Sequence, residues 1–214
     1  MSVYIIAEAG VNHNGNLELA CELIDAAADA QVDAVKFQTF VADSLVTLTA
    51  KKADYQIRST DPIESQHNML RRLELKQAEF TILRDHAEKK GISFLSTAFD
   101  NLSLDFLNNK LSLQTLKIPS GEITNGPFLL DHALTGRNLI ISTGMANIDE
   151  IKMALSIVAY GLMHKSKSKE PSLKDFTNAF SSDEGQMLLK EKVTLLHCTS
   201  QYPAPLKDIN LLAM

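Results

Sequence analysis

The chain has 214 residues, of which 45% are hydrophobic, and a formal net charge of -5. This length can bury one full α/β core, while the acidic balance without a dominant basic patch argues against a surface for nucleic acid or for an anionic membrane. No apolar run reaches about eighteen residues and no signal-peptide pattern opens the chain, so neither membrane insertion nor export is predicted. Cys21 and Cys198 form no CxxC pair, which favours a reducing cytoplasm over a disulfide framework.

Apolar runs and helical stripes alternate along the chain. We expect strands at about 3–7, 34–38, 93–97, 115–119, 138–142 and 193–198. We expect helices at about 17–30, 77–90, 101–109, 126–135 and 148–161, with Asn16 and Asn147 as N-caps and Gly91, Gly136 and Gly161 near the helix ends. The segment from 41 to 75 should carry short helices beyond the second strand.

Residues 164–192 interrupt this rhythm. The stretch 164–171 is charged and turn-like, as expected for a solvated loop, and 175–192 is weakly helical in pattern. We therefore interpret 164–192 as an insertion in one domain that spans 1–214.

Strict alternation of strands and helices predicts a parallel sheet with right-handed crossovers. A doubly wound sheet and a closed barrel both satisfy this order. Polar residues follow every strand rather than one switch point, which favours an α/β fold of the TIM (β/α)₈ barrel type. Because only about six βα units are present, we expect an incomplete barrel, truncated at its C-terminal side.

Two lysines lie inside runs that otherwise predict buried strands, Lys36 and Lys117. A buried cation is costly unless an anion or a hydrogen-bonding network compensates it, so these side chains indicate an anionic ligand. Gln38 shares the side of its strand with Lys36 because side chains alternate along a strand. A pair on a solvated edge is the alternative, and a plain salt bridge from Lys117 to Glu8 or Glu122 also stays open.

The motif at 8–15, EAGVNHNG, places Glu8 at the tip of the first strand. Its asparagines suit turn chemistry, whereas we expect Glu8 to be functional. His13 could approach the site, but no pair of histidines has metal-ligand spacing. Ser96 with Thr97, Ser120, and Ser142 in the run Ser-Thr-Gly at 142–144 lie at the ends of other strands. They offer hydroxyl and backbone donors of the kind that bind phosphate, although Ser-Thr-Gly alone is a common turn.

Six segments together closely resemble the bacterial sialic acid synthases of the NeuB type, in their N-terminal TIM-barrel portion. These are EAGVNHNG (8–15), VKFQTF (35–40), FLSTAF (94–99), KIPSGE (117–122), ISTGM (141–145) and LHCTSQYP (196–203). The resemblance implies a transferase that condenses phosphoenolpyruvate with N-acetylmannosamine and water to give N-acetylneuraminate and phosphate. Alternatives are a legionaminic or pseudaminic acid synthase using another 2-acetamido sugar, or a non-catalytic fragment of such an enzyme.

The resemblance also assigns roles by motif. The groups expected to hold phosphoenolpyruvate are Lys36, Thr97, Lys117, Ser120 and Ser142. Gln38 and Tyr202 would contact the amino sugar, while Glu8 and Glu122 would flank the reacting carbons as catalytic residues.

Further parts of such enzymes are expected outside this sequence. A divalent ion, Mn²⁺ or Mg²⁺, would polarise the sugar aldehyde, with its ligands beyond residue 214, and no metal ligand is assigned here. A C-terminal antifreeze-like domain would complete the partner subunit's site in a homodimer. We therefore expect the 214-residue chain alone to be inactive. A sugar-phosphate acceptor would require extra arginines at the strand tips, and this sequence shows none there.

Overall fold

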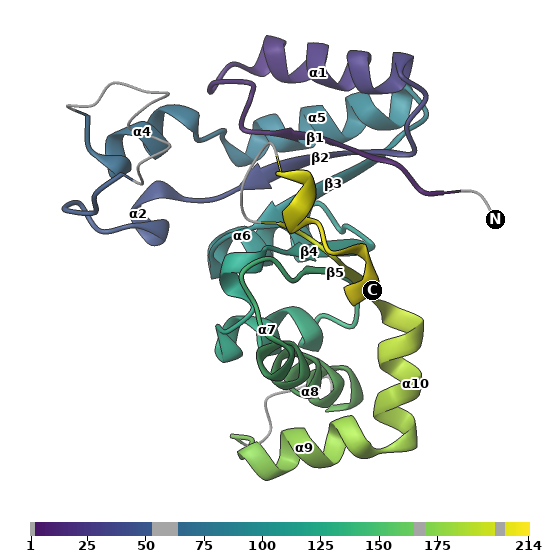
Figure 1. Cartoon of the computed structure of the whole chain (residues 1–214). Helices are drawn as coiled ribbons and strands as arrows, with labels where there is room; N and C mark the ends of the chain where they lie inside the picture. The colour runs from purple at the N-terminus through teal and green to yellow at the C-terminus, as the bar shows by residue number, and fades with distance from the viewer. Residues whose placement is uncertain (1–2, 53–63, 165–169, 200–203) are drawn as a thin grey trace. The chain divides into compact units, whose positions relative to one another are not determined.

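The computed structural model describes residues 3–52, 64–164, 170–199 and 204–214. The chain divides into two compact units, Met1–Leu113 and Gln114–Met214 (Figure 1). Each unit is built from parallel strands joined by helices, as the alternating pattern predicts.

The first unit contains three parallel strands in chain order. They are β1 (Ile6–Gly10), β2 (Ala34–Thr39) and β3 (Ser93–Ala98). Two long helices, α1 (Leu17–Asp29) and α5 (Gln77–Lys89), contact each other and pack against this sheet (Figure 1). Ile24 and Leu83 of these helices are fully buried and form the core with Phe37, which stacks on Phe94 at 5.5 Å between ring centroids.

The first strand begins later than the sequence predicts. Ile5 donates its backbone N–H to the carboxylate of Asp33 at 2.6 Å, outside the strand ladder. The ladder with β2 begins at Ile6 and continues to Gly10, with an irregularity between Glu8 and Gly10. The expected range of 3–7 was therefore wrong at both ends, because pairing with β2 and not hydrophobicity sets the limits.

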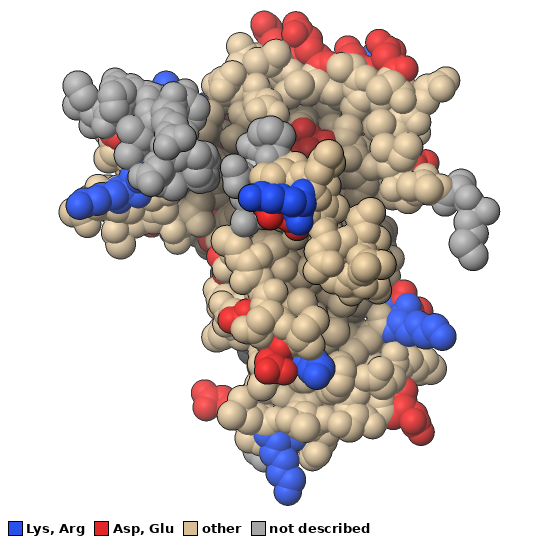
Figure 2. All heavy atoms as spheres, viewed as in Figure 1, with Lys and Arg blue, Asp and Glu red and all other residues tan. Residues whose placement is uncertain are grey.

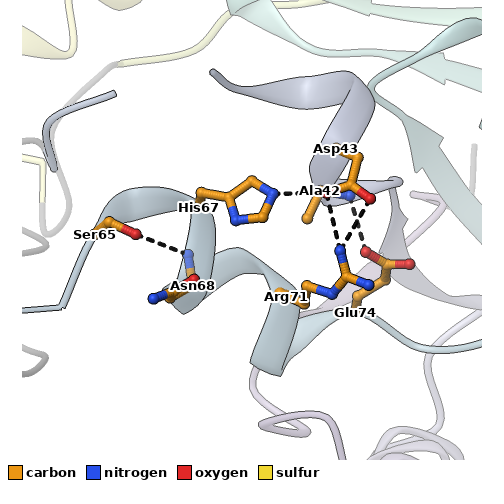
Figure 3. A network of polar contacts seen from close by, with 7 residues as sticks. All are labelled: Ala42, Asp43, Ser65, His67, Asn68, Arg71 and Glu74. Carbon is orange, nitrogen blue, oxygen red and sulfur yellow. Dashed lines mark hydrogen bonds and ion pairs between the residues drawn. The ribbon is translucent and has the colours of Figure 1, made fainter. Parts of the chain in front are cut away.

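A polar network joins the two short helices that follow β2, α2 (Ala42–Leu45) and α4 (Gln66–Leu73) (Figure 3). Asp43 accepts from Arg71 at 2.9 Å and contacts His67 at 2.7 Å. These two hydrogen bonds hold the pKa of Asp43 below its usual value. Glu74 accepts the backbone N–H of Ala42 at 2.9 Å. The predicted short helices are thus confirmed on both sides of residues 53–63, which lie outside the described part.

After β3, the chain forms α6 (Asn101–Asp105) and then a π-helical turn (Phe106–Lys110). Asp100 caps α6 by accepting the N–H of Ser103 at 2.8 Å. Its other carboxylate oxygen accepts the backbone N–H of Val41 at 2.8 Å. One buried aspartate therefore fixes the start of this helix against the end of β2.

The second unit also contains three parallel strands in chain order. They are β4 (Thr115–Ile118), β5 (Asn138–Ser142) and β6 (Val193–Leu196). Between them run α7 (Gly126–Leu134) and α8 (Ile148–His164), which contact each other (Figure 1). The Asn147 N-cap is confirmed, since its side chain accepts from Asp149 and Glu150, each at 3.0 Å.

Gly161 does not end α8, which corrects the expectation from sequence. The helix continues to His164, and Gly161 is buried where α8 approaches α7. A Cβ atom at this position would lie 2.4 Å from the Cβ of Ala133. The glycine therefore allows close helix packing and does not act as a C-terminal cap.

The described part of the 164–192 insertion is helical. It contains α9 (Leu173–Ser181) and α10 (Asp183–Lys192), both in contact with α8. Ser172 and Asp175 form a capping box at the start of α9. The sequence predicted weak helicity only from 175, because the packing against α8 that stabilises these helices is tertiary. Residues 165–169 lie outside the described part.

Acidic side chains gather over α1 on the face shown in Figure 2, while lysines and arginines are scattered in that view. The α1 sequence LELACELIDAAAD contains four carboxylates and neither lysine nor arginine. Within the described residues, no helix is both long and apolar enough to cross a membrane.

Candidate functional site

In the first unit, four of the predicted site residues lie together at the ends of the strands. This Glu8 cluster consists of Glu8, Lys36, Gln38 and Thr97. Glu8 and Lys36 are directly opposite on β1 and β2, and their side chains form an ion pair. The Lys36 ammonium also donates to the hydroxyl of Thr97 at 3.4 Å. With only 12% of its side chain exposed, Lys36 is held by partners from two neighbouring strands.

Gly10 lies between Glu8 and Gln38. A Cβ atom at Gly10 would be 3.2 Å from Glu8 Oε1 and 3.5 Å from Gln38 Nε2. The backbone of Gly10 has φ +54°, a conformation that side chains rarely adopt. The missing side chain therefore leaves room for both polar groups, and the sequence signal for this was the first glycine of the 8–15 motif.

The two faces of β2 differ as the alternation predicts. Lys36 and Gln38 belong to the Glu8 cluster, whereas Phe37 packs on the other face against Phe94. Ser96, next to Thr97, is also on that other face, where its hydroxyl bonds with Thr39 at 2.7 Å. The sequence grouped Ser96 with Thr97 as a phosphate ligand, and this grouping was wrong because neighbouring residues on a strand face opposite ways.

In the second unit, Lys117 is 7% exposed on β4. Its ammonium donates to the carbonyl oxygen of Ile118 at 2.7 Å. The lysine is therefore withdrawn from bulk water, as the buried-strand pattern predicts. We refer to it with Ser120, Glu122 and Ser142 as the Lys117 set, since all four lie at or beyond the ends of β4 and β5.

Two hydroxyl groups in the turns after β4 and β5 bind backbone atoms. Ser120 Oγ accepts the N–H of Gly144 at 3.0 Å, which ties the turn after β4 to the turn after β5. A Cβ atom at Gly144 would lie 3.0 Å from that same oxygen, so the glycine allows this approach. Thr143 similarly donates its hydroxyl to the carbonyl of Leu196 at 2.9 Å.

The remaining predicted residues take different positions. Glu122 lies in a short helical turn and accepts from the amide of Asn125 at 2.7 Å. Ser142 is buried at the end of β5, opposite Leu196 of β6. Tyr202 lies outside the described residues.

Two buried histidines, one in each unit, have opposite protonation patterns. His13 Nδ1 accepts the backbone N–H of Gly15 at 3.0 Å, so its proton is on Nε2. His132 Nδ1 donates to the carbonyl of Phe128 at 2.9 Å, so its Nε2 carries a lone pair. Neither Nε2 has a hydrogen-bonding partner in the described part of the chain. Burial lowers the pKa of His13 and lowers that of His132 to about 4, so both rings are neutral at pH 7.

A divalent metal does not fit the residues described. Across 3–52, 64–164, 170–199 and 204–214, no three His, Cys, Asp or Glu side chains lie together in a way that could hold an ion. We therefore derive no chemical step through a metal from this chain.

The NeuB family profile matches residues 23–214. The chain belongs to the NeuB family. Among its relatives, an N,N'-diacetyllegionaminic acid synthase of Legionella pneumophila is 45% identical over 100% of this chain and 53% of its own length. The enzyme of the same name from Campylobacter jejuni is 46% identical over 98% of this chain and 55% of its own. The chain thus spans about half the length of these curated relatives.

Among solved structures, an N-acetylneuraminic acid (sialic acid) synthetase of Leptospira borgpetersenii matches with a TM-score of 0.72 and 32% identity. The match covers 100% of this chain and 60% of that protein. It confirms the α/β fold class of an incomplete (β/α)₈ barrel that the alternation of strands and polar tips predicts. By their names, these relatives are synthases of N,N'-diacetyllegionaminic acid and of N-acetylneuraminic (sialic) acid.

Sequence reasoning missed the partner of Lys36. It considered a bridge from Lys117 to Glu8, whereas Glu8 pairs with Lys36. The available signal was the order of the first two strands, because consecutive parallel strands are usually neighbours and their tips meet.

Proposed function

We propose that the protein of which this chain forms part condenses phosphoenolpyruvate with a 2-acetamido sugar, and that its product is of the diacetyllegionaminic type. The identities of 45% and 46% to two legionaminic acid synthases exceed the 32% to a sialic acid synthetase. The expectation of N-acetylneuraminate as product is therefore replaced by its alternative.

The acceptor sugar can be narrowed from the relatives' product. N,N'-diacetyllegionaminic acid carries two acetylated nitrogens, as its name states. Phosphoenolpyruvate contains no nitrogen, so both acetamido groups must come from the other substrate. We propose a diacetamido sugar with a free aldehyde in its open-chain form.

The Glu8 cluster is the observation that carries the proposal at the level of chemistry. Phosphoenolpyruvate is a multiply charged anion and needs fixed cations with convergent donors. Lys36 is such a cation, held in place by Glu8 and Thr97. Two of its three N–H bonds have these partners, and a substrate carboxylate would accept the third.

The reaction forms a bond between C3 of phosphoenolpyruvate and the aldehyde carbon. Water adds at C2, and one of its protons passes to the aldehyde oxygen, which becomes a hydroxyl. The C2–O bond to phosphate then breaks, the oxygen of the water becomes the C2 carbonyl, and the second proton leaves with phosphate. Glu8 would take a proton from that water, and Gln38 would orient the acceptor sugar, since both lie beside Gly10. Lys117 and Ser120 would contribute to anion binding, and Glu122 to proton transfer.

The test is phosphate release by the full-length protein, supplied with phosphoenolpyruvate, a divalent salt and one sugar at a time. A sugar with two acetamido groups, one of them at C2, should give the highest kcat/KM, ahead of N-acetylmannosamine and its 6-phosphate. A higher kcat/KM with N-acetylmannosamine would indicate sialic acid as the product. If no amino sugar led to phosphate release, the proposal would be wrong. The 214-residue chain, assayed in parallel, should release none.

A further inference from the structure

The loop after β1 is organised around one buried histidine. His13 is 1% exposed although it lies in a connection between a strand and a helix. Backbone turns flank it, with Asn12 N–H donating to Ala9 and Asn16 N–H donating to His13 itself. The Gly15 N–H donates to His13 Nδ1 at 3.0 Å, so the loop closes around the ring.

The ring of His13 packs on the face of β2 opposite to Lys36 and Gln38. Its centroid is 6.0 Å from that of Phe37, which in turn stacks on Phe94. Phe37 stands between Lys36 and Gln38 on β2 and points to the opposite face. His13 therefore packs against one face of β2, and the proposed substrate ligands Lys36 and Gln38 lie on the other face.

Gly15 fixes the other side of the loop. It has φ +75°, and a Cβ atom there would lie 2.1 Å from the carbonyl oxygen of Arg72. The loop thus lies directly against α4, which the Asp43 contacts join to α2 (Figure 3). Between β2 on one side and α4 on the other, the path from Glu8 to Gly15 has little freedom.

We propose that His13 is a positioning residue for the condensation, an inference that rests on the proposed function. Its Nδ1 lone pair holds the Gly15 amide, and its ring anchors the loop behind β2. Together these contacts set the irregular end of β1 between Glu8 and Gly10, where the Glu8 carboxylate meets Lys36. The buried Nε2–H of His13 has no hydrogen-bonding partner among the described residues, and this lowers the stability of the folded chain. Such a cost is typical of residues that hold the geometry of a functional site.

Two substitutions in the full-length protein distinguish the contribution of the Nδ1 lone pair of His13 from that of the packing of its ring. His13→Phe keeps an aromatic ring beside Phe37 but removes the acceptor for Gly15. His13→Asn loses the ring but places an acceptor oxygen at the same distance from the backbone as Nδ1. A misplaced carboxylate costs about ten- to a hundredfold in kcat, so we expect that loss for the phenylalanine variant, with the KM for phosphoenolpyruvate changed less than threefold. The asparagine variant should recover part of kcat, because it restores the acceptor for Gly15 but not the packing of the ring.

Wild-type kcat in the phenylalanine variant, or equal loss in both variants, would overturn the role of the lone pair. If the phenylalanine variant fails to fold, NMR of the wild-type protein still tests the hydrogen bond between His13 and Gly15. The ¹⁵N shift of His13 Nδ1 should be that of an unprotonated nitrogen, and the Gly15 amide should exchange slowly. A protonated Nδ1, or exchange as fast as at an exposed loop, contradicts the inference. Failure of the proposed function is distinct, because the wild-type protein would then release no phosphate with any sugar.

Discussion

The lysines near the strand ends of the two units make different kinds of contact. In the Glu8 cluster, Lys36 contacts side chains of neighbouring strands, the Glu8 carboxylate and the Thr97 hydroxyl. In the Lys117 set, the lysine contacts the carbonyl of Ile118, and Ser120 contacts the N–H of Gly144.

This difference separates two ways of building a polar site. Contacts between side chains position and balance the charged groups of the site, and removing such a contact leaves the backbone hydrogen bonds intact. Contacts from side chains to backbone hold the turns, and removing one frees a peptide group that must find another partner. We therefore expect substitutions in the first unit to act on chemistry and those in the second to act on both structure and binding.

Glu8→Gln in the full-length protein should give the largest effect. Loss of a proton-transfer group lowers kcat by about 10² to 10⁴. Affinity for phosphoenolpyruvate should hold or rise, because Lys36 loses a competing carboxylate. Steady-state kinetics together with calorimetry measure both, and Glu22→Gln on the exposed side of α1 is the matched control. A weaker affinity with unchanged kcat would show that Glu8 only orients Lys36.

His132 should make the second unit sensitive to acid. Burial lowers its pKa from 6.5 to about 4, so the unfolded chain binds the proton more readily than the folded one. The free energy of unfolding therefore does not depend on the protonation of His132 above about pH 6.5. It decreases by about 3 kcal/mol as the pH falls from 6.5 towards 4, because the unfolded chain takes up the proton first.

Urea unfolding of the chain at pH 4 to 7 measures this slope. Replacing His132 with leucine should flatten it, whereas His164→Asn, at an exposed position, should not. An unchanged slope in the leucine variant would assign the acid sensitivity to other groups, among them His13, whose pKa is also lowered.

Lys117→Met should weaken phosphoenolpyruvate binding by about 10- to 100-fold, the size of a charged hydrogen bond. Folding should survive, because methionine keeps the apolar stem without a buried charge. Lys36→Met should weaken binding to a similar degree, and Lys174→Met is the control at an exposed position. Calorimetry of the double variant then measures the coupling between the two lysines, and a combined loss that differs from the sum of the single losses shows that they share one ligand.

The smallest effects should come from the hydroxyl groups. Ser120→Ala leaves the Gly144 N–H without its acceptor and should cost about 1 kcal/mol of unfolding free energy. Thr97→Val removes only a side-chain acceptor of Lys36, so stability should change less while phosphoenolpyruvate affinity falls severalfold. Thermal melts and calorimetry of both variants compare the two units directly. Equal losses of stability would contradict the distinction between them.

Much of the fold could be predicted from local patterns. The N-caps Asn16 and Asn147 act within a few residues, and so does the alternation that puts Lys36 and Gln38 on one face of β2. The end of α8 was missed because Gly161 serves a contact with α7, and a packing glycine and a capping glycine look alike in sequence.

By itself, the sequence determined the order of the βα units, the faces of the strands and the identity of the polar groups at their ends, since these depend on periodicities of two and 3.6 residues. Only the tertiary structure decided which groups meet. The pairing of Glu8 with Lys36, the burial of His13 behind Phe37 and the bond from Ser120 to Gly144 depend on strand register and loop closure. Register is set by pairs of residues 23 to 59 positions apart, which no local pattern encodes.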